Sequence, residues 1–295
     1  APNVMARSLR TKKSFLIGLI IPDIENPVYP APVRGIQDVA NQKDYSVIIH
    51  STDGNERKEI ETIRRLTAAG VDGLIINISE SCALLGEEIR RLRQGSLPIV
   101  ALGPWHADLE IDCVSVDNQQ GAYLATEHLL KLGHRKIAIV LGPKENLSSR
   151  ERFRGYKKAM DDSCVQVLPD LIQEGNFKMG SGYKAAQKLL AGEEKPDAIF
   201  CVNDVMALGA VKAIQEGGLR IPEDLAVIGF DDIELAALSK PSLSSVAQPK
   251  YETGKIAAEL LFQQIKGSLS PGRYYSIEPN LVIRETTLKV KETIP

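Results

Sequence analysis

The hydrophobic positions between Asp197 and Asp232 predict a strand, a helix and a second strand. An unbroken apolar run, Ala198–Val202, precedes Val205–Glu216, where apolar residues recur at intervals of three and four. A second apolar run, Leu225–Phe230, ends at two aspartates. The runs are typical of strands buried on both faces, and the spacing between them is typical of an amphipathic helix. Because such a crossover joins parallel strands, the polar residues after both strands lie at the same edge of one sheet.

The same alternation of strands and helices recurs along the chain in two series. Strand-like runs of the first series begin near Phe15, Tyr45, Gly73, Leu97 and Cys113, with helical patterns at Pro32–Asn41, Glu56–Ala69 and Leu84–Arg93. Runs of the second series begin near Lys136, Leu171, Ala198, Leu225 and Ser245, with helical patterns at Glu151–Asp161, Gly182–Ala191 and Val205–Glu216. Since the spacings of the two series match closely, the sequence predicts one doubly wound module built twice.

The two modules are joined around Ser115–Gln120, which leads into a helix at Ala122–Leu132. The tail predicts a helix at Tyr251–Lys266 and a strand at Ser276–Ile283, and we expect it to return to the first module. The fold class is therefore α/β, with two doubly wound parallel-sheet subdomains. The expected boundaries are residues 14–117 with 248–275 for the N-terminal subdomain, 118–247 with 276–295 for the C-terminal subdomain, and 1–13 for a linker. Several crossings between subdomains would form a hinge that permits closure around a ligand.

The composition is that of an ordinary globular protein, with 43% hydrophobic and 25% charged residues. No apolar stretch reaches membrane-spanning length and the N-terminus lacks the apolar core of a signal peptide, so we expect a cytoplasmic protein. The cysteines have no close spacing, and the histidines have no metal-ligand spacing; we expect buried thiols, no metal and no cofactor. The cysteines are Cys82, Cys113, Cys164 and Cys201.

The positive charge is concentrated at the start of the chain. No acidic residue precedes Asp23, whereas Arg7, Arg10, Lys12 and Lys13 are basic. The net charge of −2 becomes −6 when these four positive charges are left out. A cationic arm on an acidic body is expected if only the arm contacts the phosphates of a nucleic acid.

Three segments resemble the effector-domain signatures of the LacI/GalR family of bacterial transcriptional repressors. They are Val202–Gly209, Gly218–Asp224 and Ile228–Asp232, and the resemblance extends in the right order over essentially the whole chain. It implies a type I periplasmic-binding-protein-like fold with a ligand cleft between the subdomains. It also implies a homodimeric repressor in which a small-molecule effector, a sugar or alternatively a purine, controls operator binding.

The N-terminal segment resembles the hinge helix of this family, which has the pattern Asn-x-x-Ala-Arg-x-Leu. On that basis Asn3, Ala6 and Arg7 would face the operator minor groove, and Leu9 would be the apolar wedge that kinks the duplex. A frayed basic leader is the alternative interpretation. The family's helix-turn-helix module would precede Ala1 and is absent from this sequence, so we expect a truncated form of the protein.

Polar and aromatic side chains collect just after the predicted strands. Carboxylates and amides suit sugar hydroxyls, which both donate and accept, and rings suit the apolar face of a sugar or a flat base. A purine, a hexose or a disaccharide stays open as the ligand. These positions are Asp23, Asn26, Asp53, Asn77, Ser79, Gly103–Trp105, Asp117, Asn118, Ser148–Arg150, Arg152, Asn176, Phe177, Asn203, Asp204, Phe230, Asp231 and Gln248.

The resemblance assigns roles to several of these residues. It implies that Arg152 fixes effector oxygens, that Asp231 accepts from ligand hydroxyls on the opposing wall of the cleft, and that Phe177 is an aromatic wall. Asp204 is expected to cap the helix that follows it. The predicted effector-binding set is Asn26, Tyr29, Asn77, Arg152, Phe177, Asn203, Phe230, Asp231 and Gln248. The chain departs from the family at Val28, where a second aromatic is usual, and at Gly103–Pro104, where many pentose-binding members have Asp-Arg.

No arrangement of residues favours catalysis, and we expect the protein not to be an enzyme. Gly142–Lys144 lacks the glycine and hydroxyl positions of a phosphate-binding loop. Asp231 and Asp232 would point in opposite directions in extended backbone, which makes them a poor acid and base pair. The alternative function is a periplasmic-type sugar-binding protein, which shares the fold; the basic arm and the missing signal sequence count against it.

Overall fold

The computed structural model describes residues 13–78, 83–104, 109–267 and 272–288, and these residues form two compact units. Unit 1 runs to Val116 and takes in Pro249–Ile277. Unit 2 comprises Asp117–Gln248 and the chain from Glu278 onward. The chain therefore passes from one unit to the other after Val116, after Gln248 and after Ile277.

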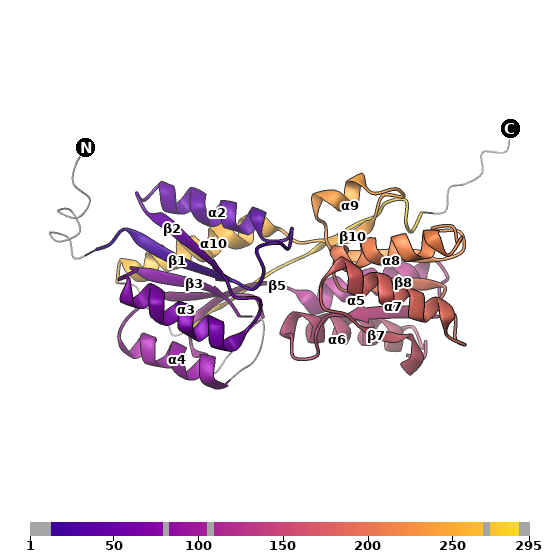
Figure 1. The fold of residues 1–295 in the computed structure, drawn as a ribbon, viewed down its shortest axis with the longest axis horizontal. Helices are drawn as coiled ribbons and strands as arrows, with labels where there is room; N and C mark the ends of the chain where they lie inside the picture. The colour runs from indigo at the N-terminus through magenta and orange to yellow at the C-terminus, as the bar shows by residue number, and fades with distance from the viewer. Residues whose placement is uncertain (1–12, 79–82, 105–108, 268–271, 289–295) are drawn as a thin grey trace. The chain divides into compact units, whose positions relative to one another are not determined.

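Unit 1 is a parallel sheet flanked by helices (Figure 1). Its strands, in spatial order, are β11 (Tyr274–Ile277), β5 (Asp112–Val116), β4 (Ile99–Leu102), β3 (Gly73–Asn77), β1 (Leu16–Ile21) and β2 (Ser46–Ser51). Every neighbouring pair in this order is parallel. The helices are α2 (Pro30–Asn41), α3 (Glu56–Ala68), α4 (Ala83–Gln94) and α10 (Lys250–Ile265).

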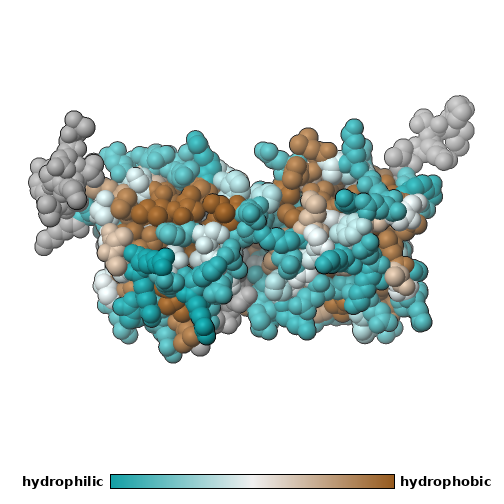
Figure 2. Space-filling view, viewed as in Figure 1, coloured by the Kyte–Doolittle hydropathy of each residue, from teal (hydrophilic) through white to brown (hydrophobic). Residues whose placement is uncertain are grey.

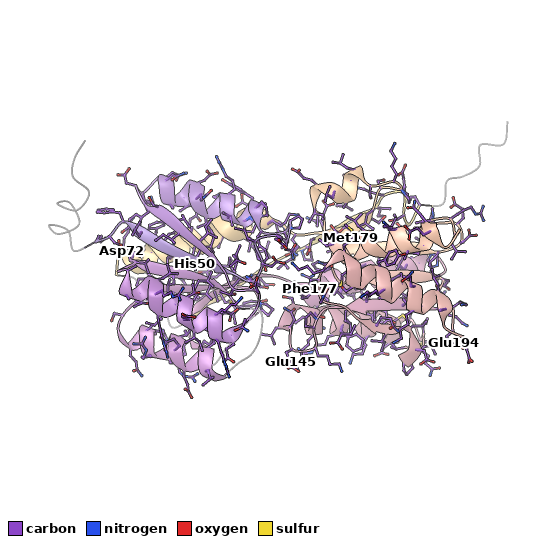
Figure 3. The ribbon with its side chains drawn as sticks, viewed as in Figure 1. His50, Asp72, Glu145, Phe177, Met179 and Glu194 are labelled. Carbon is purple, nitrogen blue, oxygen red and sulfur yellow. The ribbon has the colours of Figure 1, made fainter. Side chains whose placement is uncertain are left out.

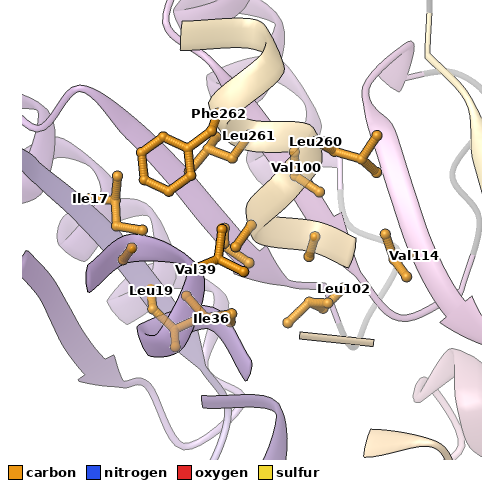
Figure 4. Packing of buried hydrophobic residues seen from close by; sticks show 14 of the residues in the cluster. Ile17, Leu19, Ile36, Val39, Val100, Leu102, Val114, Leu260, Leu261 and Phe262 are labelled. Atoms are coloured by element: carbon orange, nitrogen blue, oxygen red, sulfur yellow. The ribbon is translucent and has the colours of Figure 1, made fainter. Parts of the chain in front are cut away.

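Strand β1 shows why the strands of this sheet are apolar at successive positions. Ile17 and Leu19 pack in one cluster with Val39 of α2, and Leu261 of α10 belongs to the same cluster (Figure 4). Ile20 belongs to a second cluster, which contains residues of α3 and α4. Because successive side chains of a strand point to opposite faces, helices cover this sheet on both sides.

Unit 2 repeats the strand order of unit 1. Its strands, in spatial order, are β12 (Asn280–Val282), β10 (Ser244–Ala247), β9 (Ala226–Asp231), β8 (Ala198–Cys201), β6 (Ile137–Leu141) and β7 (Ile172–Glu174). The helices are α5 (Asn118–Lys131), α6 (Leu147–Asp162), α7 (Met179–Ala191), α8 (Asp204–Glu216) and the short α9 (Glu234–Leu238), with a 3₁₀ turn at Pro169–Leu171. Strand for strand, in chain order, this is the order of unit 1, so the prediction of a module built twice is confirmed.

The helices of unit 2 also cover both faces of its sheet. Gly121 of α5 lies against the ring of Phe230 in β9, and the neighbouring residue Gly229 lies against Asp204 of α8. Since adjacent residues of a strand face opposite ways, α5 and α8 lie on opposite faces. Helix α6 packs with α5 and α7 packs with α8, so each face carries one pair of helices.

The tail contains two strands where the sequence predicts one. The single strand expected at Ser276–Ile283 is wrong: β11 pairs with β5 of unit 1 in the parallel sense, and β12 pairs with β10 of unit 2 in the antiparallel sense. The break falls at Glu278 and Pro279. A proline has no backbone N–H to donate to a ladder, so it favours the end of a strand.

Helices α7 and α8 pack closely because glycine lies on both sides of their contact. A Cβ atom at Gly182 would meet the carbonyl oxygen of Met206, and one at Gly209 would meet the carbonyl oxygen of Met179. The two backbones therefore approach each other without room for a methyl group.

We predict that Gly182→Ala lowers the free energy of unfolding by about 1–3 kcal/mol, because the methyl group forces the two helices apart. Gly180→Ala is the matched control, since it lies in the same helix with no atom within 4 Å of the added Cβ. The control gains helix propensity and becomes more stable by up to about 1 kcal/mol. Chemical denaturation followed by circular dichroism measures both changes. Equal effects of the two substitutions would contradict the close packing.

Candidate functional site

Arg152 is the centre of a cluster at the carboxyl edge of the sheet in unit 2. Its side chain projects from α6 and the residue is only 7% exposed. The Nε atom donates to Oδ1 of Asn118 at 2.8 Å, and a terminal nitrogen donates to the carbonyl oxygen of Val202. Asn118 begins α5 and Val202 follows β8, so two further segments meet at this one guanidinium.

Strand β9 supplies an aromatic ring and a carboxylate to the same cluster. The guanidinium carbon of Arg152 lies 3.7 Å from the centroid of the Phe230 ring. A terminal nitrogen of Arg152 lies 3.6 Å from Oδ1 of Asp231, and the two side chains are 8% and 4% exposed. The expectation that Arg152 and Asp231 lie on opposing walls of a cleft is wrong, because both belong to unit 2 and form a buried ion pair.

The backbone at the end of β9 is strained. Asp231 has φ +112° and Asp232 has φ +51°, and residues other than glycine rarely adopt such positive φ angles. Gln248, just after β10, donates from Nε2 to Oδ1 of Asp231 at 2.5 Å, and Arg284 pairs with Oδ1 of Asp232 at 2.7 Å. The two aspartates are thus held in place by neighbours. The backbone at these two aspartates is therefore outside the ordinary extended region, and strain of this kind is typical of functional sites.

Asn203, and not Asp204, caps helix α8. The Oδ1 atom of Asn203 accepts from the backbone N–H of Met206 at 3.0 Å. Asp204 is fully buried and accepts from the backbone N–H of Ile233 at 2.9 Å and from the hydroxyl of Ser245 at 2.6 Å. Burial, together with the nearby charge of Asp231, raises the pKa of Asp204. The predicted cap at Asp204 is therefore one residue too late.

The same Asn203 side chain holds the aromatic residue of the site. Its Nδ2 atom donates to the carbonyl oxygen of Phe177 at 3.1 Å. Phe177 is half-buried just before α7, with φ +65° (Figure 3). Its ring lies against Gly142, the residue after β6, where a Cβ atom would collide with the ring. Each polar atom of Asn203 makes one of these contacts, so the side chain positions both Phe177 and α8.

The predicted site residues of unit 1 lie at the carboxyl ends of its strands. Asn26 follows β1, and its Oδ1 atom accepts from the backbone N–H of Val28 at 3.1 Å. Tyr29 immediately precedes α2 and packs against the cluster that contains Ile17. Asn77 is the last residue of β3. The predicted DNA-binding residues Asn3, Ala6, Arg7 and Leu9 lie outside the described residues, as does Trp105.

Comparison with known proteins identifies the family. Residues 126–287 match the family model of the periplasmic binding protein-like domain. The chain is 36% identical over 290 residues to the ribose operon repressor of Haemophilus influenzae, covering 98% of this chain and 86% of the relative. It is also 36% identical over 293 residues, with the same coverage, to the HTH-type transcriptional repressor PurR of Aliivibrio fischeri. The chain belongs to the LacI/GalR family.

Solved structures of LacI/GalR regulators share the fold. The CelR–cellobiose complex superposes with a TM-score of 0.85 at 26% identity, covering 95% of this chain and 89% of that one. A LacI family regulator from Enterococcus faecium with bound ribose gives a TM-score of 0.82 at 30% identity, covering 94% and 100%. The predicted type I periplasmic-binding-protein-like fold is confirmed. The relatives are transcriptional regulators and not enzymes, in agreement with the sequence-based expectation.

Within the described parts of this LacI/GalR chain, no group of side chains is arranged to hold a metal ion. No helix in those parts is both long enough and apolar enough to span a membrane. Cys113 and Cys201 are buried thiols, as expected, whereas Cys164 is exposed. Cys82 lies outside the described residues.

The predicted set omits two residues of the Arg152 cluster. The sequence shows Asn118 only as a polar residue after a predicted strand, and Glu151 only as the first residue of a predicted helix. Glu151 accepts from Nδ2 of Asn118 at 3.1 Å, and burial raises its pKa. The signal for Asn118 was its place at the end of β5, whereas Glu151 has no local pattern that separates it from an exposed helix charge.

We predict that Arg152→Ala lowers the free energy of unfolding by about 3–5 kcal/mol, because Asp231 loses its buried cation. Arg154→Ala is the matched control, since Arg154 is exposed on the same helix and its loss costs at most about 0.5 kcal/mol. Urea denaturation of both variants measures the difference. Equal stability of the two variants would show that the buried pair does not stabilise unit 2.

Proposed function

We propose that this chain is the effector-responsive part of a transcriptional repressor and that its effector is a sugar. The buried Arg152–Asp231 pair at the carboxyl edge of unit 2 carries the proposal. A guanidinium donates and a carboxylate accepts, which matches hydroxyl groups that do both, and the half-buried ring of Phe177 nearby suits the apolar face of a sugar. Related regulators have been solved with cellobiose and with ribose, which supports a sugar over a purine.

The proposal includes operator DNA as the second partner. The pattern Asn3, Ala6, Arg7 and Leu9 supports contact with the minor groove, with Leu9 as the wedge. Effector and operator would then affect each other's affinity through a reciprocal coupling, typically about 1–3 kcal/mol. We expect the protein to act in the cytoplasm, where operator DNA lies. Asn26, Tyr29 and Asn77 of unit 1 stay candidates for effector binding.

We predict that D-ribose or cellobiose raises the unfolding temperature of the wild-type chain by several degrees, since a ligand at 100 times its Kd stabilises by about 2.7 kcal/mol. Arg152→Lys should remove this shift, because lysine keeps the charge beside Asp231 but lacks the planar fork of donors. Arg154→Lys, on the exposed side of the same helix, should respond as wild type does. Scanning fluorimetry with both sugars and hypoxanthine makes the measurement.

Three results would count against this assignment. If the unfolding temperature of Arg152→Lys rises with ligand as much as that of wild type, Arg152 is not part of the binding site. A shift with hypoxanthine alone would replace the sugar by a purine, and no shift with any of the three compounds would contradict the proposed effector class.

A homodimer is part of the proposal, because a symmetric operator with two half-sites requires a two-fold symmetric protein. Helix α9 offers a surface for it: Leu235 is 50% and Leu238 is 74% exposed, one turn apart. Figure 2 shows hydrophobic residues at the surface over α9. Leu238 also lines a groove of ≈ 640 Å³, whose wall contains apolar residues such as Ile221 and Pro222 and charged residues such as Glu223 and Lys240. An exposed leucine beside a groove with apolar residues in its wall allows a self-complementary contact, which a two-fold interface requires, so we assign this surface to a second copy of the chain.

We predict that Leu238→Glu raises the Kd of the dimer by at least about tenfold, because a charge would have to be buried in the interface. Met179→Glu is the control, since Met179 is 46% exposed on α7 of the same unit. Sedimentation equilibrium of the two variants measures the association. An unchanged dimer in Leu238→Glu, or equal weakening in both variants, would contradict the assignment to α9.

A further inference from the structure

Two of the passages between the units end at the Arg152–Asp231 pair. Asn118 is the second residue of unit 2 after the passage at Val116, and it binds Arg152. Gln248 is the last residue of unit 2 before the chain returns to unit 1, and it binds Asp231. Each partner of the buried ion pair is therefore held by a side chain from a different passage.

The hydrogen-bond partners fix the orientation of the Asn118 amide. Asn118 is 2% exposed, its oxygen accepts from Nε of Arg152, and its nitrogen donates to a carboxylate oxygen of Glu151. A flipped amide would turn its NH₂ group toward the donor of Arg152 and its oxygen toward the carboxylate of Glu151, and both contacts would be repulsive. Glu151 thus keeps the amide oxygen of Asn118 directed at Arg152.

The contact at Nε determines where the rest of the guanidinium points. The group is planar, with Nε at one corner and the terminal nitrogens at the other two. The face of the plane lies on the ring of Phe230, at 3.7 Å from its centroid. The face is held by Phe230, Nε is held by Asn118, and one terminal nitrogen donates to the carbonyl oxygen of Val202. Asn118 and Val202 together therefore set the direction of the terminal donors.

We infer that Asn118 is a positioning residue for the effector: it orients the guanidinium of Arg152 so that the terminal donors meet the ligand. The inference rests on the proposed function and adds to it a residue that need not touch the ligand. The first passage between the units then bears directly on effector affinity, because any shift at Asn118 changes the direction of the donors of Arg152.

The test is titration calorimetry on the 295-residue chain, using D-ribose, cellobiose and hypoxanthine as probes. With the probe that binds wild type, Asn118→Ala should raise Kd roughly ten- to hundredfold, the equivalent of one hydrogen bond to a charged group. Gln119→Ala is the control, since Gln119 is the next residue and is exposed. Its Kd should stay within about threefold of the wild-type value.

An exchange of the two groups provides a rescue. In the double variant Asn118→Asp with Glu151→Gln, the new carboxylate accepts both from Nε of Arg152 and from the new amide at position 151. The total charge is unchanged, one hydrogen bond reverses its direction, and the negative charge moves from position 151 to position 118 beside Nε of Arg152. The double variant should recover a Kd within about threefold of the wild-type value, which a general loss of stability in Asn118→Ala would not explain.

The outcomes separate this inference from the function on which it rests. If wild type binds a probe and Asn118→Ala binds it equally well, the positioning role is overturned and the proposed function stands. If the double variant stays as weak as Asn118→Ala, the hydrogen bond to Nε is not what sets affinity and the inference is again overturned. If wild type binds none of the probes, the proposed function fails and the inference falls with it.

Discussion

The free-energy cost of burying the charge of Arg152 explains the contacts at the carboxyl edge of the sheet in unit 2. An arginine that is only 7% exposed must recover through protein contacts the hydration that it loses. Arg152 does so with an amide from the start of α5, a carbonyl after β8 and a carboxylate and a ring from β9. These groups reach one point because a parallel sheet gathers the carboxyl ends of its strands at a single edge. The arrangement of the sheet therefore determines which side chains can become partners.

The repeated topology explains why polar residues are found at these strand ends. The central strands of each sheet are covered on both sides by helices, so most of their side chains pack in apolar surroundings away from the strand ends. Where a strand stops, its carboxyl end and the N-terminus of the next helix present unpaired backbone groups, and polar side chains satisfy them. Asn203 shows the result, since one amide caps α8 and also holds the loop of Phe177.

Much of the fold was predictable because the signals were local. The run Ala198–Val202 and the spacing in Val205–Glu216 each lie within one element, and the structure places β8 and α8 there. The contacts of the site were less predictable because they join distant segments: Arg152 reaches residues 34 and 50 positions away in the chain. Sequence pattern showed that these residues follow strands but not which would pair. The assignment of the cap to Asp204 failed for a related reason, since only geometry decides which of two adjacent side chains turns back to the helix. Helix α9, with five residues, was too short to show a period.

The late position of α10 in the chain has a consequence for biosynthesis. Its Leu260, Leu261 and Phe262 complete the apolar cluster on one face of the sheet of unit 1. All strands of that sheet except β11 are translated before unit 2 begins. On the ribosome, that face stays open while the whole of Asp117–Gln248 emerges. Unit 2 contains most of its own core by then, so the second half of the molecule can become compact before the first half does. This chain order allows a folding sequence that is the reverse of the N-terminus-first order usual for domains made of one continuous stretch.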